Sequence, residues 1–329
     1  MPHVSVLMPV YNAENFLAEA IESILQQSLS DFEFIIIDDC STDSSVAIIQ
    51  SYQDDRIKLY RNKINSGISY SLNRGIKLAT TELIARMDAD DISYPQRLQR
   101  QYDYLLAHPE CAMVSSFAQM ITEEKEVIRI DEFKSELYYY NLTFSCWIYH
   151  PTVVYRKGAV QEVGMYSVPY AEDFELWWQL SRRFVITTLP EVLLDYRVTS
   201  QSLHQVQKRQ EYTLAQQQQI VRNIRYYAGS DYVISENHVE CLQHNFQPLL
   251  EEQSVDSVLE CLHKLDFITT KIIEKQNPNL IKEDIMTAVF YKKQFIAQYY
   301  INHLPKRKAV LLAVKMGMLK KAASVFLNK

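Results

Sequence analysis

Two repeating patterns of apolar residues run through the first 120 residues of this chain. Short, continuously apolar runs predict strands, and apolar residues three or four positions apart predict helices that cover them. Phe32–Ile37 is such a run, interrupted only by Glu33, and is typical of a parallel strand buried on both faces. Leu17, Ile21 and Ile24 have helical spacing, and Asn12 precedes them as a candidate N-cap. In chain order, the predicted strands are His3–Pro9, Phe32–Ile37, Arg56–Tyr60 and Glu82–Met87, each followed by a predicted helix.

The pattern becomes mixed between about residues 112 and 197 and helical after about Ser202. The mixed part contains one predicted helix, Phe174–Arg183, and the predicted strands Cys111–Met120, Val127–Ile130, Thr152–Arg156 and Val192–Arg197. Strands that alternate with helices predict a doubly wound α/β sheet. We therefore expect an α/β domain up to about residue 200, followed by a helical region.

Composition narrows the classes of protein that fit. The 329 residues suffice for one large domain or two modest ones, and 47% of them are hydrophobic, so a packed core is expected. The five cysteines are scattered without a CxxC pair, which argues against a zinc site or a disulfide framework and fits a reducing cytosol. The sequence shows no secretory signal, and no apolar run is long enough to predict a membrane-spanning helix.

Charge is distributed unevenly along the chain. Residues 285–329 contain nine Lys or Arg and no Asp or Glu, so subtracting their +9 from the total of −6 leaves −15 for residues 1–284. Lysines interrupt the apolar residues of this basic tail, which suits a helix lying in a membrane interface. The alternative is a solvated basic helix packed on the acidic body, and the sequence does not decide between the two.

Polar and aromatic side chains follow three of the predicted strands. Asp38 and Asp39 come after the second strand and Asp88 and Asp90 after the fourth, and open α/β sheets bind ligands where their strands end. Clustered carboxylates repel one another unless they share a cation, so Asp88 and Asp90 are candidate ligands of Mg²⁺ or Mn²⁺. Tyr11, after the first strand, offers a ring on which a base can stack, and Asp39 can accept a hydrogen bond from the base edge.

Each of these features also has a simpler structural interpretation. Tyr11 alone fits a packing residue, whereas Asp38, Asp39 and the residues Ser41–Asp43 fit a turn and a helix cap. An Asp-x-Asp pair is common by chance. Three loops at one sheet edge, each with suitable chemistry, favour a binding site over these separate explanations.

The chain resembles the inverting glycosyltransferases of sequence family two, which share the GT-A fold. The resemblance covers about residues 3–200 and rests on motifs in the family's order. These motifs are Val4–Asn12, Ile37–Asp43 with Cys40 where glycine is more usual, Asn65–Gly67, Asn73–Gly75, Ile84–Asp91 followed by Pro95, Arg97 and Gln101, His150–Arg156, and Glu172–Asp173. We identify no family for the chain after about residue 205.

The resemblance implies a division of the chain by function. A GT-A catalytic domain would occupy residues 1–204, with nucleotide-sugar binding in 1–120 and the acceptor side and the base in 121–204. Residues 205–329 would form a helical C-terminal region with the basic tail.

The resemblance also implies roles for single residues. Asp90 would ligate the metal together with Asp88, and Asp88 would also bind the ribose or the diphosphate. Asp173 would be the general base, with Glu172 the next candidate. The donor-binding residues would be Pro9, Tyr11, Asp39, Asn65, Arg86 and Asp88.

The implied reaction moves a sugar from a nucleotide-diphosphate sugar to a hydroxyl of a glycan or lipid-linked glycan, with Mg²⁺ or Mn²⁺ as cofactor. Asp39 and Tyr11 suit uracil, so we expect a UDP-sugar. A carboxylate about 3 Å from the hydroxyl can take its proton, and direct attack inverts the anomeric centre. Many such relatives build surface polysaccharides, including capsule and lipopolysaccharide, so we expect a cytoplasmic protein at the inner face of the cytoplasmic membrane, without a nucleic-acid partner.

Other residues near these motifs have open roles. Glu172 and Asp173 also fit an acidic helix N-terminus. We expect one of Trp177 and Trp178 in the core, with the other open to the acceptor. Two roles are open for four further residues: a contact with the donor, metal or diphosphate, as in some relatives, or an ordinary part of the fold or surface. These residues are His150, Arg156, Arg197 and His204.

Two other functions compete with glycosyl transfer. A nucleotidyltransferase needs a glycine-rich, basic loop after the first strand, whereas Pro9–Asn12 contains no glycine. The same absence argues against a dinucleotide-binding dehydrogenase. A catalytically inactive glycan-binding or scaffold protein on this fold is the other alternative, and the retention of Asp39, Asp88, Asp90 and Asp173 argues against it.

Overall fold

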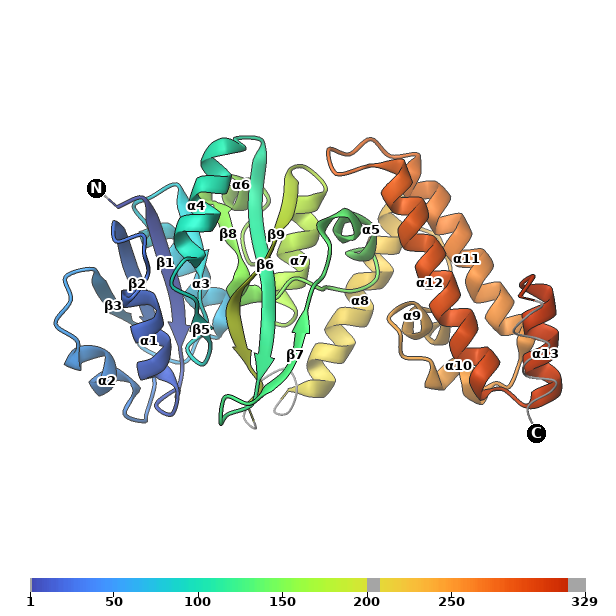
Figure 1. The fold of residues 1–329 in the computed structure, drawn as a ribbon, viewed down its shortest axis with the longest axis horizontal. Coiled ribbons are helices and arrows are strands. Elements are labelled where there is room, and N and C mark those ends of the chain that lie inside the picture. The colour runs from blue at the N-terminus through green and yellow to red at the C-terminus, as the bar shows by residue number, and fades with distance from the viewer. Residues whose placement is uncertain (1, 200–207, 319–329) are drawn as a thin grey trace. The chain divides into compact units, whose positions relative to one another are not determined.

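The computed structural model describes residues 2–199 and 208–318, which divide into two compact units (Figure 1). Unit 1 contains the described residues of Met1–Tyr138 and Trp147–Tyr212. Unit 2 contains those of Tyr139–Cys146 and Thr213–Lys329. The segment Tyr139–Cys146 therefore belongs to the helical unit although it lies inside the sheet-forming part of the sequence, which the apolar pattern did not predict.

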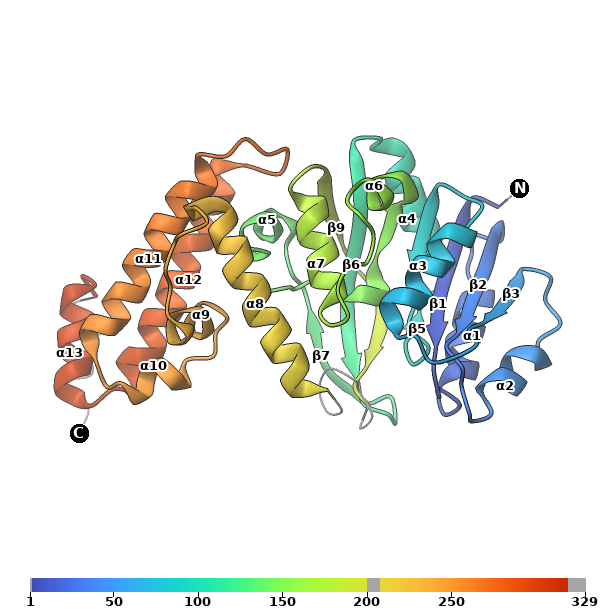
Figure 2. The same cartoon turned by 180° about the vertical axis from the view of Figure 1, so that it is seen from behind.

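A single mixed sheet organises unit 1. Its strands run in the order β3-β2-β1-β4-β8-β6-β9-β5, and β7 pairs with β6 outside this path. In the described residues, α1 and α4 lie on one face of the sheet (Figure 1), and α3, α6 and α7 lie on the other face (Figure 2). The predicted doubly wound, mixed α/β fold of the GT-A type is confirmed.

The parallel half of the sheet forms from the apolar runs at the start of the chain. Strand β1 pairs in parallel with β2 on one side and with β4 on the other, so the loops after these strands meet at one edge. All seven residues of β2 are buried, the two acidic residues Glu33 and Asp38 together with the apolar ones. The elements of this half are β1 (Val4–Val10), α1 (Leu17–Leu25), β2 (Phe32–Asp38), α2 (Ser45–Ser51), β3 (Ile57–Arg61), α3 (Ile68–Leu78) and β4 (Leu83–Arg86).

The second half of the sheet is mixed. Strand β6 pairs antiparallel with β8 and parallel with β9, and β8 joins this half to β4. Its elements are β5 (Ile92–Ser93), α4 (Arg97–Ala107), β6 (Cys111–Ile121), β7 (Val127–Asp131), η1 (Ser135–Leu137), η2 (His150–Thr152), β8 (Val154–Arg156), α6 (Lys157–Glu162), α7 (Glu172–Ser181) and β9 (Val185–Arg197).

In its described residues, unit 2 consists of helices and the loops between them and contains no strand. Helices α11, α12 and α13 pack on one another, and Leu262, Leu265, Ile296 and Leu312 are fully or almost fully buried in their cores. The helices in the described C-terminal part are α8 (Arg209–Ala228), α9 (Glu236–Leu242), α10 (Gln247–Glu251), α11 (Val255–Ile273), α12 (Lys282–His303) and α13 (Lys306–Lys315), and α5 (Tyr138–Asn141) lies in the inserted segment. Of the helices described, none is long and apolar enough to cross a membrane.

Two local expectations were wrong. Asn12 does not cap α1, which begins at Leu17; Asn12 has a left-handed backbone (φ 48°), and its Oδ1 accepts a hydrogen bond from the Thr42 backbone N–H at 2.8 Å. The side chain thus joins the loops after β1 and β2. Strand β9 begins at Val185 rather than Val192, because irregular pairing with β6 accommodates Pro190 within the strand.

Candidate active site

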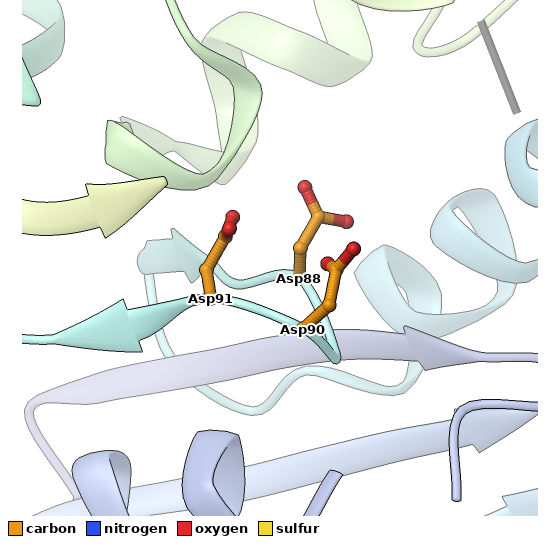
Figure 3. Close-up of side chains that lie close together, drawn as sticks. All are labelled: Asp88, Asp90 and Asp91. Atoms are coloured by element: carbon orange, nitrogen blue, oxygen red, sulfur yellow. The ribbon is translucent and has the colours of Figure 1, made fainter. Parts of the chain in front are cut away.

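Three carboxyl groups gather directly after β4. Each of Asp88, Asp90 and Asp91 offers an oxygen that lies within 4.8 Å of the other two, and Figure 3 shows their side chains projecting to the same side of the loop. The sequence predicted Asp88 and Asp90 as the metal-binding pair. Asp91 is an addition, which its position next to Asp90 could have suggested.

The electrostatics of this cluster suit a divalent cation. Burial, together with the neighbouring Asp88, raises the pKa of Asp90 to about 7. Burial, with Asp90 and Asp88, raises the pKa of Asp91 well above its usual range. The buried Oδ2 of Asp91 accepts no hydrogen bond in the described structure. A hard cation bound by carboxylate oxygens would remove this repulsion, so the residues fit Mg²⁺ or Mn²⁺.

Two buried arginines hold the acidic loop in place. Arg86, at the end of β4, forms an ion pair with Asp88. Arg197, at the end of β9, donates its backbone N–H to Asp91 Oδ1 and its Nε–H to the Asp90 carbonyl, each at 2.8 Å. The remaining guanidinium nitrogens of Arg197 bond Glu123 O and Glu19 Oε2. Arg197 thus positions the acidic loop through its backbone N–H and its Nε–H, and its other two guanidinium nitrogens anchor the side chain.

Asp173 and Glu172 form the first turn of α7 and lie in the field of the same cluster. Burial raises the pKa of Asp173 to about 6, and Asp88 contributes to the rise. Burial and the neighbouring Asp173 raise the pKa of Glu172 to about 8. The Phe174 backbone N–H donates to Asp173 Oδ1 at 2.7 Å and fixes the direction of this carboxylate. Of these two adjacent carboxyl groups, Asp173 therefore ionises at the lower pH.

A buried aromatic and imidazole group supports α7. His150 Nε2 and the Tyr166 hydroxyl form a hydrogen bond of 2.7 Å, and His150 Nδ1 lies 3.8 Å from Glu172 Oε1. Burial, and then Arg86, lowers the pKa of His150 well below its usual range, so the ring is neutral. His150 could be a residue of the site or an ordinary part of the fold, and the structure places it beside the acidic residues of the site. Arg156 instead donates to the backbone carbonyls of Leu105 and Cys111 and belongs to the fold.

The predicted nucleoside-binding residues lie at the same edge of the sheet. Asp39 is buried at the end of β2, and its carboxylate accepts hydrogen bonds from Asn62 Nδ2 at 2.6 Å and from the backbone N–H groups of Ser66 and Gly67. Asp39 therefore holds the loop after β3, a role that the sequence did not reveal. These three donors use most of the hydrogen-bonding capacity of the Asp39 carboxylate, which has about four acceptor sites.

The other predicted donor-binding residues differ in exposure. Tyr11 is 46% exposed, so a ring face is free of packing. Asn65 is exposed in the loop after β3, and Pro9 is half-buried near the end of β1. These side chains come from loops that the parallel pairing of β1 with β2 and of β2 with β3 brings to one edge.

The aromatic residues on the acceptor side differ from the expectation. Trp177 and Trp178 are both buried, so neither is left open to an acceptor. Tyr212, at the start of α8, lies near the site instead: burial, followed by Glu172, Asp173 and Asp88, raises the pKa of its hydroxyl. Its ring contacts Tyr170 edge-on, with centroids 5.2 Å apart. No motif in the sequence marked Tyr212.

His204, the other open candidate for a metal or diphosphate contact, lies outside the described residues. Its role stays a prediction of the family resemblance.

Comparison with known proteins relates the chain to glycosyltransferases. The family profile described as "Glycosyl transferase family 2" matches residues 5–164. An uncharacterized glycosyltransferase of Haemophilus influenzae is 29% identical over 314 residues, which cover 86% of this chain and 97% of that protein. The O-antigen biosynthesis glycosyltransferase WbnJ of Escherichia coli is 29% identical, covering 79% and 94%. The uncharacterized glycosyltransferase MJ1057 of Methanocaldococcus jannaschii is 30% identical, covering 64% and 77%.

Solved structures share the fold at low sequence identity. The crystal structure of S. aureus TarS 1-349 in complex with UDP-GlcNAc is similar with a TM-score of 0.59 at 16% identity, covering 92% of each chain. The mannosyltransferase PcManGT from Pyrobaculum calidifontis, in complex with GDP-Man and Mn²⁺, is similar with a TM-score of 0.52 at 17% identity, covering 100% of this chain and 88% of that one.

Proposed function

Since this chain belongs to glycosyl transferase family 2, we propose that it transfers a sugar from a UDP-sugar to a hydroxyl of a glycan or lipid-linked glycan, with inversion at the anomeric carbon. The observation that carries this proposal is the placement of Asp173, which ionises more readily than Glu172, in the electrostatic field of an acidic cluster that includes Asp88 and could hold a cation. The reaction needs both groups, one for the nucleophile and one for the leaving diphosphate.

Donor binding would use the edge formed by the loops after β1, β2 and β4. Tyr11 would stack on the base, and Asp39, with Asn65 nearby, would bind its polar edge. Arg86 would hold Asp88 in the position from which it binds the ribose or the diphosphate. A bound Mg²⁺ or Mn²⁺ would neutralise the diphosphate as it leaves. Support comes from TarS, which was crystallised with UDP-GlcNAc, and PcManGT, with GDP-Man and Mn²⁺.

Proton transfer would be the task of Asp173. Its free Oδ2 would accept the proton of the acceptor hydroxyl while that oxygen attacks the anomeric carbon on the side opposite the diphosphate. One displacement of this kind inverts the configuration and needs no enzyme nucleophile. Glu172, mainly protonated at neutral pH, would leave Asp173 as the base.

The biological role would be the synthesis of a surface polysaccharide such as capsule or lipopolysaccharide. Support comes from WbnJ, an O-antigen biosynthesis glycosyltransferase, and from a putative teichuronic acid biosynthesis glycosyltransferase of Bacillus subtilis that is 26% identical. These names favour transfer over the two alternatives, an inactive scaffold and a nucleotidyltransferase. We place the protein in the cytoplasm at the inner face of the membrane, where lipid-linked acceptors are found.

A donor screen tests this proposal. The purified chain would be heated with a panel of UDP- and GDP-sugars, with and without Mn²⁺, and the ligands that raise its melting temperature would be titrated by calorimetry. We expect UDP to bind more tightly than GDP and Mn²⁺ to strengthen binding. Tighter binding of GDP would contradict the assignment of uracil, and binding of no nucleotide sugar would contradict the function.

A further inference from the structure

The segment that precedes the proposed general base, Asp173, is held on helix α3 by the side chains of Asn73 and Ser69. Residues 164–171, here called the base strap, connect α6 to α7. Asn73, on α3, donates from Nδ2 to the Tyr166 carbonyl at 2.8 Å, and the Tyr166 backbone N–H donates to Asn73 Oδ1 at 3.1 Å. Ser69, one turn earlier on α3, donates from Oγ to the Val168 carbonyl at 2.7 Å. Both polar atoms of the Asn73 amide thus serve the base strap.

The base strap has a backbone that needs such support. Met165 and Ala171 are non-glycine residues with left-handed backbones, at φ 57° and 52°, and Gly164 before them has φ 97°. Conformations of this kind cost free energy and persist where surrounding contacts hold them. Ala171 immediately precedes Glu172 and Asp173, so the last strained residue sets where α7 begins and where both carboxylates lie.

The same helix reaches the donor side of the site. Helix α3 begins at Ile68, directly after Ser66 and Gly67, whose backbone N–H groups donate to Asp39. At its centre, Asn73 binds Tyr166, whose hydroxyl bonds His150 beside Glu172. Helix α3 therefore joins the loop that would bind the nucleoside to the segment that places the base.

We propose that Asn73 is a positioning residue that fixes the general base Asp173 relative to the donor, by holding the base strap on α3. This inference rests on the proposed role of Asp173. Asn73 would touch neither the donor nor the acceptor. Its loss would leave donor affinity intact and misplace the base, and a misplacement of about 1 Å can slow a reaction by about 10²-fold.

The test compares three variants with the wild-type chain. Asn73→Ala removes both bonds to Tyr166, Ser69→Ala removes only the bond to Val168, and Lys77→Ala is a control on an exposed position of the same helix. For each variant we would measure the Kd of UDP in Mn²⁺, kcat and KM for sugar transfer, and hydrogen exchange of the strap amides by mass spectrometry. Ser69→Ala keeps the proposal testable if Asn73→Ala does not fold.

We expect Asn73→Ala to lower kcat by about 10²-fold, to leave the Kd of UDP within twofold and to speed exchange of the base strap. Ser69→Ala should show the same pattern with a smaller loss, and Lys77→Ala should match wild type. The proposal is overturned if Asn73→Ala keeps kcat within twofold, or if the Kd of UDP weakens by the same factor as kcat falls. Failure of the proposed function would look different, since wild type itself would then transfer no sugar, and the exchange data would still show whether Asn73 holds the strap.

Discussion

At the scale of single residues, two adjacent carboxyl groups of the site have different pKa values because their surroundings differ. Glu172 is buried and Asp173 half-buried, and the pKa of Glu172 is raised to about 8 whereas that of Asp173 is raised only to about 6. The Phe174 N–H bonds the Asp173 carboxylate and opposes the effect of burial. Groups whose pKa values are pushed apart in this way commonly divide the acid and base roles, which supports the proposed role of Asp173 as the base.

Exchange of the two carboxyl groups for amides separates their roles. Asp173→Asn keeps the shape and the bond from Phe174 but removes the proton acceptor, so we expect transfer to fall by about 10²- to 10⁴-fold with the Kd of UDP unchanged. Glu172→Gln imitates a carboxyl that is already mainly protonated, and we expect at least a tenth of the wild-type rate. Transfer kinetics and calorimetry measure the two effects. Wild-type turnover by Asp173→Asn would place the base elsewhere.

The pH dependence of transfer follows from the same group. A general base works in its ionised form, so the rate should be constant above the pKa of Asp173 and fall as pH drops below about 6. Over the acid limb we expect kcat/KM to lose about tenfold per pH unit. A pH–rate profile from pH 5 to 8 measures this. A rate that stays level down to pH 5 would exclude Asp173 as the essential base.

Local sequence predicted only part of the site. Asp88 and Asp90 could be singled out because they follow a predicted strand, whereas the role of Asp173 came from the family resemblance. The bonds that Asp39 accepts from the backbone N–H groups of Ser66 and Gly67, and the place of Tyr212, were not identifiable. They depend on which loops the sheet order brings together, and one-dimensional spacing does not contain that order.

At the scale of elements, α3 lies unusually close to the sheet, at Gly75. A Cβ built on Gly75 would lie 2.1 Å from Leu7 Cδ1, and Leu7 is fully buried in β1. The glycine of the Asn73–Gly75 motif is therefore explained by packing between a helix and a strand. The contact also keeps α3 close enough to the sheet for Asn73 and Ser69 to reach the base strap.

Substitution of this glycine tests the packing. Gly75→Ala should force Leu7 to move and lower the free energy of unfolding by about 1–3 kcal/mol, as overpacked cores do. Gly158→Ala is the matched control, because its Cβ would meet only the end of the Glu82 side chain at 3.3 Å. Chemical denaturation of both variants measures the difference. Equal stability of Gly75→Ala and wild type would show that α3 and β1 adapt without cost.

Helices and strands were predicted well where one hydrophobic period dominates the sequence, and poorly where contacts with other elements override that period. The buried run of β2 lies within one residue of the prediction. The start of β9 was missed because Pro190 suggests a break in a strand. Asn12 was taken for a cap, but its side chain bonds a loop that follows a different strand.

At the scale of the whole molecule, the basic tail has its own contacts. In α13, Ala309, Leu312 and Ala313 are buried, and Lys315 Nζ lies 3.1 Å from Asp256 Oδ1. Both contacts fit the alternative in which the basic helix packs on the acidic body. Lys306 and Lys308 are exposed. Attachment to an anionic membrane stays a prediction, and within the described part of α13 it would use these exposed charges together with the exposed Leu311 and Val314. Lys320 and Lys321 lie outside the described residues.

Charge reversal tests the attachment without disturbing the packing. We expect wild type to float with anionic liposomes at low salt and the double variant Lys306→Glu, Lys308→Glu to lose about 2 kcal/mol of binding, roughly a 30-fold fall in partitioning. The control is Lys77→Glu with Lys134→Glu, which makes the same change of net charge at exposed positions of unit 1. Equal flotation of the two double variants, or none by wild type, would exclude this surface as the anchor.

The central claim is that a cation held by the acidic cluster drives the departure of a nucleoside diphosphate. Its most direct test is the rate of UDP release from the donor that the screen selects, measured for wild type and Asp90→Ala in Mn²⁺ and in excess EDTA. We predict release by wild type in Mn²⁺, and a loss of about 10²-fold or more in EDTA and in Asp90→Ala, because either change removes the charge that stabilises the leaving group. Full release by wild type in EDTA would contradict the account.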